Sequence, residues 1–394
     1  MFGFESVREM NKILHIYYGT RGTSGAYIEA LQSACRQAKV NSWAIVSCNY
    51  QFKSWRVIKC FFPITDHTEQ RNFWIKIIRG FELIVAYLTI GVAVLIFRPT
   101  INLHLIDDFI ITYLFYRACK FTGIKVYVTC HDVIAHDKQM NTRRLKILQE
   151  ADQLVVHSAH AKMVLLEYTE EKAINRIIQY SYPYSSYEAI LSKKQMKYAE
   201  EKLFNQLSIN SNYFLFLGYI RISKGIEILI DAWHQSVASN QSKLVIAGKW
   251  PNYLNPLKSR TEEMKNCKII NKYLTDEEFV LLIQKAKFVV LPYLDYCHSA
   301  LLMACSRHDG VIIISDIQLF KEIIPDYELS FYKGSSQDLA RVIDKANGLN
   351  DIEREYYKKK IQKSVERSDE KLVENLKSVY KEYIYKAKGV LSED

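Results

Sequence analysis

The sequence predicts an α/β protein of two domains, each built on a mostly parallel β-sheet. The chain has 394 residues, too many for one compact core of usual size and enough for two domains. Short apolar runs alternate with helix-length segments, which is typical of parallel strands covered by helices. The alternation also starts again at residue 213, which indicates a second sheet.

The first domain opens with an apolar run at residues 13–18, followed by a loop with three glycines and a helix-length segment at 26–36. This order predicts a strand, a glycine loop and a helix. The remaining strands of this sheet are predicted from the apolar runs at residues 43–48, 101–106, 125–129 and 153–157.

The second sheet is predicted from the runs at residues 213–218, 243–248, 268–270, 288–291 and 311–315, with lysine-rich helices after them. Between the two sheets lie Pro183 and a polar helical stretch that ends in SINSN, and both favour a domain boundary. The expected organisation is a first domain over 1–183, a linker over 184–211, a second domain over 212–370 and a C-terminal helix over 371–394.

The composition is that of an ordinary globular protein, with 49% hydrophobic and 24% charged residues. Lysine plus arginine exceed aspartate plus glutamate by 53 to 43, so the surface favours anionic partners such as phosphates, acidic lipid headgroups or nucleic acid. No aromatic and basic clustering of a nucleic-acid module is present, and we expect no nucleic-acid partner.

The eight cysteines stand singly, without CxxC pairs, and we interpret them as reduced thiols. The N-terminal residues carry acidic side chains early and lead directly into a strand, without the regions of a signal peptide. Both features predict a cytoplasmic protein.

One stretch raises the question of a membrane. Glu82 and Arg98 bracket fifteen uncharged residues, LIVAYLTIGVAVLIF, preceded by the partly basic FWIKIIRGF. Fifteen residues fall short of the roughly twenty that cross a bilayer, and we expect the stretch to hold the end of one element and the start of another. The leading interpretation is a buried helix of the first domain, and a transmembrane helix is the least favoured. The remaining alternative is a monotopic membrane surface formed by Phe73, Trp74, Ile77, Lys76 and Arg79.

The most informative segment is FLFLGYIRISKGIEILIDAW, where an apolar strand ends at Gly218 and a helix follows. Arg221 and Lys224 lie in the intervening loop. Ligands bind at the carboxyl ends of parallel strands, so these two cations could hold a diphosphate leaving group. Breaking a glycosyl phosphate bond builds negative charge on the leaving oxygen, which fixed cations stabilise in the transition state. The alternative is solvated surface charge beside a turn.

This strand, loop and helix, with Gly218, Arg221, Lys224 and Gly225, resembles the phosphate-binding segment of the group 1, family 4-like, retaining glycosyltransferases. Three further stretches resemble that family in its own order: VYVTCHDVIAHDK, ADQLVVHSAHAKMVLLE and FVVLPYLDYCHSALLMACSRHDGVIIISDIQLFKEII. The resemblance covers roughly residues 13 to 340. It implies the GT-B fold, in which two Rossmann-like domains have parallel sheets facing a central cleft.

The resemblance also implies roles in the first domain. His131, which Asp132 and His136 accompany in the family's order, corresponds to the active-site histidine near the transferred sugar. It would orient sugar hydroxyls or supply a backbone carbonyl to the oxocarbenium-like centre, and the alternative is a structural histidine. The family's glycine loop, which approaches the donor phosphates and the acceptor closely, corresponds to Gly19, Gly22 and Gly25. An ordinary strand-to-helix turn is the alternative there.

In the second domain, Ser299 and Ala300 precede or begin a helix whose free backbone N–H groups could hold phosphate oxygens. The family's commonest members carry two glutamates eight positions apart around this loop, where this chain has Asp295 and Met303. Asp295 could still contact a sugar hydroxyl, whereas Met303 cannot accept hydrogen bonds from the nucleotide ribose as a carboxylate would. Glu322 matches a donor-site glutamate found further along in many members.

The adjacent pair Asp107 and Asp108 could suggest a metal site, but successive strand residues point to opposite faces and no third ligand follows. We expect no metal, with Arg221 and Lys224 supplying the positive charge instead. The chain has no G-x-S-x-G motif and no Walker loop, which excludes a serine hydrolase of that type and a P-loop enzyme.

The function expected from this resemblance is transfer of a sugar from a UDP-, GDP- or similar nucleotide diphosphate donor to a hydroxyl acceptor, with retention of configuration. The acceptor would be a glycan or a lipid-linked glycan intermediate. The nucleotide sugar is a co-substrate, and no other cofactor is expected. Peripheral contact with the inner face of the membrane is left open. The alternative is a catalytically degenerate GT-B protein that binds a partner or glycan, which Met303 supports.

Overall fold

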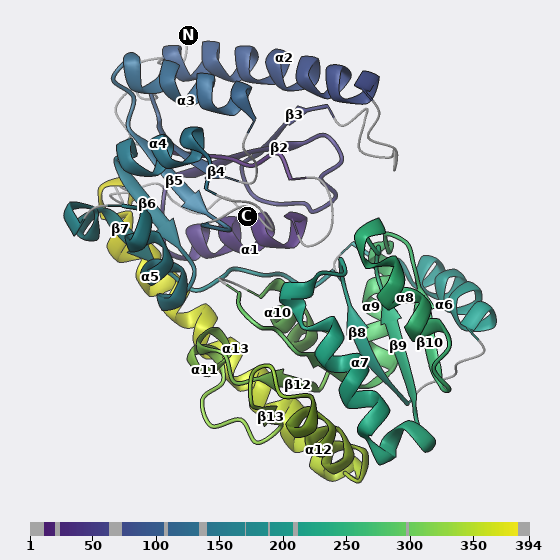
Figure 1. The fold of residues 1–394 in the computed structure, drawn as a ribbon. Helices are drawn as coiled ribbons and strands as arrows, with labels where there is room; N and C mark the ends of the chain where they lie inside the picture. The colour runs from purple at the N-terminus through teal and green to yellow at the C-terminus, as the bar shows by residue number, and fades with distance from the viewer. Residues whose placement is uncertain are drawn as a thin grey trace. The chain divides into compact units, whose positions relative to one another are not determined.

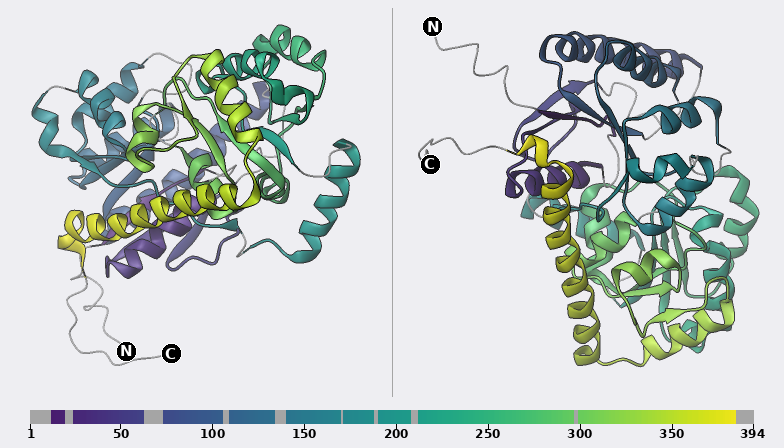
Figure 2. Two further views of the ribbon diagram at one scale, coloured as in Figure 1. Left: turned by 90° about the horizontal axis from the view of Figure 1, so that it is seen from below. Right: turned by 90° about the vertical axis from the view of Figure 1, so that its left-hand side faces the viewer.

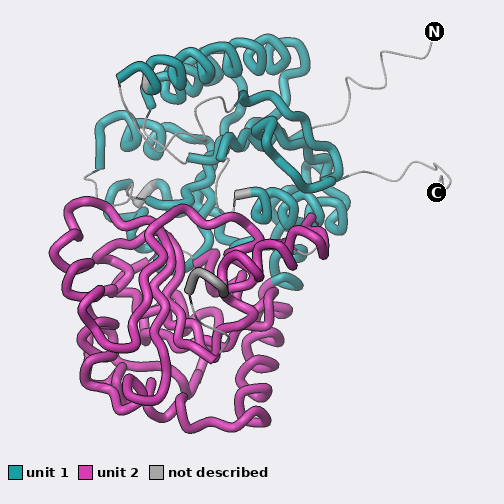
Figure 3. Tube along the Cα trace, turned by 90° about the vertical axis from the view of Figure 1, so that its right-hand side faces the viewer, with its two compact units in different colours: residues 1–184, 369–394 teal, residues 185–368 magenta. Residues whose placement is uncertain are grey.

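The computed structural model describes residues 12–19, 24–62, 73–105, 109–133, 140–169, 171–187, 190–207, 212–296 and 299–384. The chain divides into two compact units, which are residues 1–184 with 369–394, and residues 185–368 (Figure 3). Each unit contains a parallel β-sheet with helices packed on it, as in a Rossmann-like domain. The predicted α/β fold with two parallel sheets is therefore confirmed.

The sheet of the first unit has the strand order β3-β2-β1-β4-β5-β6-β7. Its strands are β1 (Ile13–Ile16), β2 (Ser42–Ser47), β3 (Val57–Phe61), β4 (Thr100–Leu105), β5 (Val126–Cys130), β6 (Gln153–Val156) and β7 (Ile177–Gln179). The sequence analysis missed the two edge strands. β3 is partly exposed and β7 has three residues, so neither forms a continuous apolar run.

The helices of the first unit are α1 (Ser24–Gln37), α2 (Phe73–Phe97), α3 (Ile110–Phe121), α4 (Thr142–Glu150), α5 (Ala159–Tyr168) and the 3-10 helix η1 (Glu171–Arg176). Figure 1 shows α1 on one face of the sheet and α2 with α3 on the other. Side-chain caps fix two helix starts, because Asn141 accepts from the Arg144 N–H at the start of α4 and Ser158 accepts from the Ala161 N–H at the start of α5.

The stretch expected to hold two elements is one 25-residue helix, α2, so that expectation was wrong. Ala86, Tyr87, Ile90 and Val94 are buried on one side of it, while the other side carries exposed apolar residues. The prediction of a buried helix therefore applies to one face only. Among the described residues, α2 is the one helix long and apolar enough to cross a membrane, with a mean hydropathy of 2.2 and 33% of its most apolar segment buried.

The sheet of the second unit has the order β10-β9-β8-β11-β12-β13. Its strands are β8 (Tyr213–Leu217), β9 (Lys243–Ala247), β10 (Cys267–Ile270), β11 (Ala286–Leu291), β12 (Ile312–Ser315) and β13 (Ser330–Phe331). In each sheet the strand order reverses once, between β1 and β4 and between β8 and β11. Such a reversal opens a crevice at the carboxyl ends of the strands, where ligands bind in open α/β sheets.

The helices of the second unit are α6 (Lys193–Leu207), η3 (Ile222–Lys224), α7 (Ile226–Gln235), η4 (Val237–Asn240), η5 (Asn252–Leu254), α8 (Asn255–Glu262), α9 (Asp276–Lys285), α10 (Ala300–Arg307), α11 (Gln318–Ile323) and α12 (Ser336–Asn347). The polar helical stretch expected within the linker 184–211 is α6, and this segment belongs to the second unit. This helix packs on α9, and Lys285 forms an ion pair with Glu200 at 2.7 Å.

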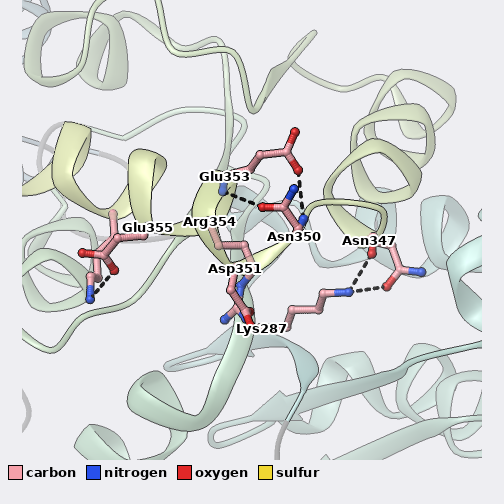
Figure 4. A network of polar contacts seen from close by, with 8 residues as sticks. Lys287, Asn347, Asn350, Asp351, Glu353, Arg354 and Glu355 are labelled. Atoms are coloured by element: carbon pink, nitrogen blue, oxygen red, sulfur yellow. Dashed lines mark hydrogen bonds and ion pairs between the residues drawn. The ribbon is translucent and has the colours of Figure 1, made fainter.

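The long helix α13 (Asp351–Val379) begins in the second unit and ends in the first. Its start is a reciprocal cap, in which the Asn350 side chain accepts from the Glu353 N–H and the Glu353 carboxylate accepts from the Asn350 N–H (Figure 4). Next to it, the Lys287 ammonium donates to the backbone carbonyl and side-chain oxygen of Asn347 (Figure 4). The Lys287 bonds join β11 to the end of α12.

Residues 371–394 were expected to form a separate C-terminal helix. Their first part is instead the end of α13, followed by the 3-10 helix η6 (Lys381–Tyr383), and the views of Figure 2 show α13 as one continuous helix. Asn102 of β4 donates to the Tyr380 hydroxyl, and Tyr383 donates to the Thr100 hydroxyl at 2.9 Å. The end of the described chain is therefore part of the first unit's core.

None of the described thiols is in a disulfide, and the reduced state stays a prediction: Cys35, Cys48, Cys60, Cys119, Cys130, Cys267 and Cys305. Cys297 lies outside the described residues.

Candidate active site

Three buried histidines form a hydrogen-bonded row across the strand reversal of the first sheet. His15 lies on β1, His104 on β4, and His131 directly after β5. The Nδ1 atom of His15 lies 3.1 Å from Nε2 of His104, and Nδ1 of His104 lies 3.1 Å from Nε2 of His131. Because β1, β4 and β5 are neighbouring parallel strands, the sheet itself sets the spacing of the three rings. The sequence analysis found His131 and missed the other two.

Burial keeps the inner histidines neutral. It lowers the pKa of His15 from 6.5 to about 3. The pKa of His104 is also well below its usual value, first through burial and then through the neighbouring histidines His15, His131 and His157. A neutral imidazole carries one N–H and one bare nitrogen, so each ring in the row can donate to one neighbour and accept from another.

The direction of the hydrogen bonds in this row follows from His15, at its inner end. The Nε2 atom of His15 is buried and has no hydrogen-bond partner among the described residues. A buried N–H without an acceptor is rare in proteins, whereas an unused acceptor is tolerated more often. We therefore assign the proton of His15 to Nδ1, which donates to His104, and that of His104 to Nδ1, which donates to Nε2 of His131. His131 then carries its own proton on Nδ1.

A fourth histidine, His157, follows β6 and lies beside His131, with 5.6 Å between the ring centroids. Its Nε2 atom lies 3.2 Å from the Tyr27 hydroxyl, and its Nδ1 atom lies 3.3 Å from the Tyr180 carbonyl oxygen. Tyr27 contacts His131 edge-on at 4.7 Å. Aromatic rings thus surround the predicted histidine, which is itself 7% exposed.

The backbone after His131 is held by a buried arginine. Arg144 of α4 is 2% exposed and donates to the carbonyl oxygen of Asp132 at 2.6 Å. Sequence reasoning did not single out Arg144, because its contact with Asp132 depends on how α4 packs. His136, Asp107 and Asp108 lie outside the described residues, so the structure gives no account of them.

Two of the three glycines expected to approach the donor are described. Gly19 follows β1, while Gly25 lies in the first turn of α1. A Cβ atom at Gly25 would be 3.0 Å from the ring of Phe52, so close packing alone explains this glycine. Gly22 lies outside the described residues. Contact of this loop with a donor stays a prediction.

In the second unit, glycines shape the loop after β8. Gly225 has φ +69°, and a Cβ atom there would be 1.8 Å from the Pro292 carbonyl oxygen. Gly218 has φ +109°, and a Cβ atom there would be 2.9 Å from the Lys224 ammonium nitrogen. Residues with a side chain rarely adopt such φ values. The predicted strand, glycine loop and helix are present, with η3 between β8 and α7.

The two predicted cations lie at this loop in different surroundings. Lys224 is 9% exposed, and its ammonium lies 5.8 Å from the centroid of the Tyr293 ring. The Arg221 guanidinium lies over Tyr219 at 5.0 Å. Its Nε and Nη1 atoms are buried and have no hydrogen-bond partner among the described residues. Buried N–H donors on a cation that lack acceptors indicate room for an anion.

The loop after β11 is joined to the cationic loop. The Leu294 N–H donates to the Ser223 carbonyl oxygen at 2.9 Å, next to the close contact of Gly225 with Pro292. Asp295 follows Leu294 and is exposed. The structure therefore brings the loop of Asp295 together with the loop of Arg221 and Lys224, on the neighbouring strands β8 and β11.

Ser299 is the N-cap of α10, and its hydroxyl accepts from the Leu302 N–H at 3.1 Å. Its side chain is therefore engaged in the helix, and the groups left for a phosphate are the backbone N–H groups of the first turn, including that of Ala300. Met303 is 1% exposed and packs in the core of the second unit. Glu322 of α11 is exposed and accepts from Gln318 at 3.4 Å.

A pocket of about 490 Å³ lies elsewhere in the second unit, near β12 and α11. Its lining includes Asp316, Asp326 and Glu328 and none of the predicted site residues. Three carboxylates suit a diphosphate poorly, and we do not assign this pocket to the donor. Among the described residues, no group of three or more His, Cys, Asp or Glu side chains is arranged to hold a metal ion.

Comparison with known proteins shows similarity in sequence and in fold. Residues 199–364 match the sequence model of the family "Glycosyl transferases group 1". The serotype-specific mannosyltransferase WbdA of Escherichia coli is 24% identical over 239 residues, which are 56% of this chain and 29% of WbdA. The chain thus spans under a third of the length of the curated relatives that it matches.

Solved structures share the fold over nearly the whole chain. The Anabaena HepE structure with UDP and glucose has a TM-score of 0.62 at 12% identity, covering 95% of this chain and 99% of HepE. Sucrose-phosphate synthase of Thermosynechococcus elongatus has a TM-score of 0.63 at 14% identity, with 94% and 98% covered. The catalytic domain of Arabidopsis thaliana starch synthase IV, bound to ADP and acarbose, has a TM-score of 0.64 at 10% identity, with 94% and 99% covered.

Proposed function

We propose that this chain, a GT-B protein whose residues 199–364 form a group 1 glycosyltransferase domain, transfers a sugar from a nucleotide diphosphate donor to a hydroxyl acceptor. The second unit would hold the donor's diphosphate. The first unit would present the acceptor, with His131 beside the transferred sugar.

The observation that carries this proposal is the state of Arg221. Two of its buried nitrogen atoms lack a hydrogen-bond partner among the described residues. The buried Lys224 lies one turn away, at the strand reversal where ligands bind in such sheets. A diphosphate would accept hydrogen bonds from both cations and remove the cost of the unused donors.

The same groups suit the chemistry of glycosyl transfer. As the bond from the sugar to the diphosphate breaks, negative charge grows on the leaving oxygen. Fixed cations stabilise that charge more in the transition state than in the ground state, without a reorganisation of solvent. We expect Arg221 and Lys224 to supply this charge in place of a divalent cation, and the first turn of α10 to add backbone donors.

We infer retention of anomeric configuration, as the family resemblance implies. In the proposed mechanism His131 does not act as a strong base. It would orient sugar hydroxyls, or its backbone carbonyl would face the positive charge at the anomeric carbon. Asp295 would accept a hydrogen bond from another sugar hydroxyl.

We propose a glycan or lipid-linked glycan as acceptor and the cytoplasm as the location, with the enzyme at the inner face of the membrane. The name of the matched relative, a serotype-specific mannosyltransferase, supports a polysaccharide substrate. The net charge of +10 supports binding of substrates that carry phosphate.

Thermal unfolding of the purified full chain with a panel of nucleotide diphosphates and nucleotide sugars tests the proposal. A ligand at about 100 times its Kd stabilises the folded state by about 2.7 kcal/mol, so the true donor should raise the melting temperature by several degrees. The shift should disappear in Lys224→Met and Arg221→Met. Arg260→Met is the control, because Arg260 also lies in the second unit but forms an exposed ion pair with Asp231.

A second candidate is a GT-B protein that binds a nucleotide or glycan without catalysis. Met303 favours it, because a buried thioether stands where common family members have a glutamate. The two functions differ in product. Release of nucleotide diphosphate from the stabilising donor, with acceptor extracts added, supports the transferase; stabilisation without any release supports the binding protein.

A further inference from the structure

The outer face of α2 is an apolar surface of unusual extent. It consists of residues spaced three or four apart on one side of the helix, each at least 37% exposed: Phe73, Trp74, Ile77, Ile78, Phe81, Ile84, Val85, Leu88, Val92, Leu95 and Ile96. Figures 1 and 2 show α2 as an outermost element of the first unit. These side chains expose on the order of 1,000 Å², against about 300–600 Å² for the largest apolar patch of a typical monomer.

The inner face of α2 is attached to its own unit. Tyr87 stacks on Phe115 of α3 with 4.7 Å between the ring centroids, and its hydroxyl lies 3.3 Å from that of Thr112. Ile90 and Val94 are at most 2% exposed. A helix that crossed a bilayer would have to leave these contacts and expose the part of α3 that it covers. The packing therefore favours a helix that lies on a membrane over one that spans it.

The charges around the helix match an anionic surface. After Glu82 the helix has no charged residue, and the Glu82 carboxylate is itself buried and paired with Arg79 at 3.2 Å. Arg98 follows the helix and is exposed, and the Lys12 ammonium lies 5.2 Å from the ring of Phe97. The neighbouring helix α3 contains no Asp or Glu.

The hydrogen-bonding groups of the outer face of α2 favour a lipid surface over a protein partner. An interface between proteins has a polar rim with about one hydrogen bond per 100–200 Å². Among the described side chains, the outer face of α2 offers two hydrogen-bonding groups, the indole N–H of Trp74 and the hydroxyl of Thr89, and the latter already donates to the Val85 carbonyl oxygen. Acyl chains need no such groups, and Trp74, at the first turn, is the residue type enriched at the level of lipid headgroups.

We propose that the outer face of α2 docks the first unit onto an anionic membrane, with the helix axis along the surface and its apolar side chains among the acyl chains. An isolated interfacial helix turns a polar face to water. α2 needs no such face, because its other side packs onto its own sheet. The docking rests on the proposed function in one respect, since it would bring the enzyme to a lipid-linked acceptor. Docking itself requires no catalysis.

Flotation of the full chain with vesicles tests the docking. We expect the protein to float with vesicles of phosphatidylcholine and phosphatidylglycerol, and to float less with phosphatidylcholine alone. Val92→Glu should lower the membrane partition coefficient at least about tenfold, because a charge among acyl chains is costly. Val237→Glu is the matched control, since Val237 is 63% exposed in the second unit and Val92 is 61% exposed. It should change partitioning less than about twofold.

Three outcomes would overturn the proposal. The wild-type chain could fail to float with anionic vesicles, or both variants could lose partitioning equally. The chain could also form a dimer in light scattering that Val92→Glu dissolves, which would make the face an interface between copies. Hydrogen exchange on vesicles separates docking from spanning, because docking leaves the amides of α3 protected and spanning exposes them. Nucleotide-induced stabilisation in solution is measured without vesicles, so a failure of docking leaves the proposed transfer untouched.

Discussion

His131 Nε2 lies 3.1 Å from Nδ1 of His104, and this contact links the predicted active-site histidine to the centre of the first sheet. His104 is fully buried and neutral, and it is bonded in turn to His15. Which ring nitrogen of His131 carries the proton therefore depends on His15, which lies two strands away from the His131 ring.

Removal of the His104 nitrogen atoms should impair transfer without loss of donor binding. His104→Phe keeps a buried ring but deprives His131 of the donor that fixes its tautomer, and we expect kcat to fall about tenfold, equivalent to about 1.4 kcal/mol, with the donor KM unchanged. His104→Gln retains an amide donor and should recover part of the rate. The measurement is initial velocity against donor concentration from pH 5 to 9. Equal losses in both variants, with an unchanged pH profile, would assign His104 a packing role only.

Acidification should destabilise the second unit through His308. Burial lowers its pKa from 6.5 to about 4, while Asp309 raises it and Arg307 lowers it. Between pH 6.5 and about 4 the unfolded chain binds a proton that the folded one does not, so the free energy of unfolding falls as the pH falls, by about 1.4 kcal/mol per pH unit.

His308→Gln should flatten this dependence, and His234→Gln, at an exposed position of α7, should not. Urea unfolding at pH 4.5, 5.5 and 6.5 measures the slope. Because the slope is compared and not the absolute stability, a general loss of stability in His308→Gln does not obscure the result. Parallel slopes for the wild type and both variants would contradict the assignment.

The cationic loop should tolerate no side chain at Gly225. Gly225→Ala combines a left-handed φ with a Cβ atom 1.8 Å from the Pro292 carbonyl oxygen, so the loop must move. Gly334→Ala has a similar φ of +82° and nothing within 4 Å of its Cβ atom, and should cost only about 1–2 kcal/mol. We expect Gly225→Ala to cost clearly more and to abolish nucleotide-induced stabilisation. Equal costs in chemical denaturation would show that φ alone constrains this loop.

The first turn of α10 should contribute to binding of the nucleotide's phosphates as well as to the stability of the protein. Ser299 and Ser335 are both N-caps, and the hydroxyl of each accepts a backbone N–H at 3.1 Å. Alanine at either position should cost about 1 kcal/mol of stability. Only Ser299→Ala should also weaken binding of the nucleotide, which isothermal titration calorimetry measures. A similar affinity in both variants would remove α10 from the proposed donor site.

Local sequence was sufficient for the inner strands of both sheets and for the cationic loop, but not for the edge strands β3, β7 and β13. The strand, Gly218 and the helix after Gly225 depend on residues adjacent in the chain, and the structure contains them as predicted. His104 and Arg144 were missed because their roles depend on neighbours far apart in sequence. His104 meets His131 only through the pairing of β4 with β5, and Arg144 meets Asp132 only when α4 packs.

The apolar stretch shows a different difficulty. Hydrophobicity predicted burial for residues 83–97, since a helix apolar on all sides is usually enclosed. Composition cannot distinguish the side that Tyr87 buries against α3 from the side that Leu88 exposes, because both sides are equally apolar. The length was also underestimated, since Arg79 and Glu82 pair within the helix and do not interrupt it.

The shared helix α13 determines the order in which the protein can fold as it is made. The first unit begins at the N-terminal side of the chain, yet Leu376, Tyr380 and Tyr383 fill its core. A ribosome must therefore complete the whole second unit before β1 and β4 receive their last packing partners. Until then the first unit has an open flank beside Asn102. A nascent chain that stalls after the second unit would carry one finished unit and one that chaperones still have to protect.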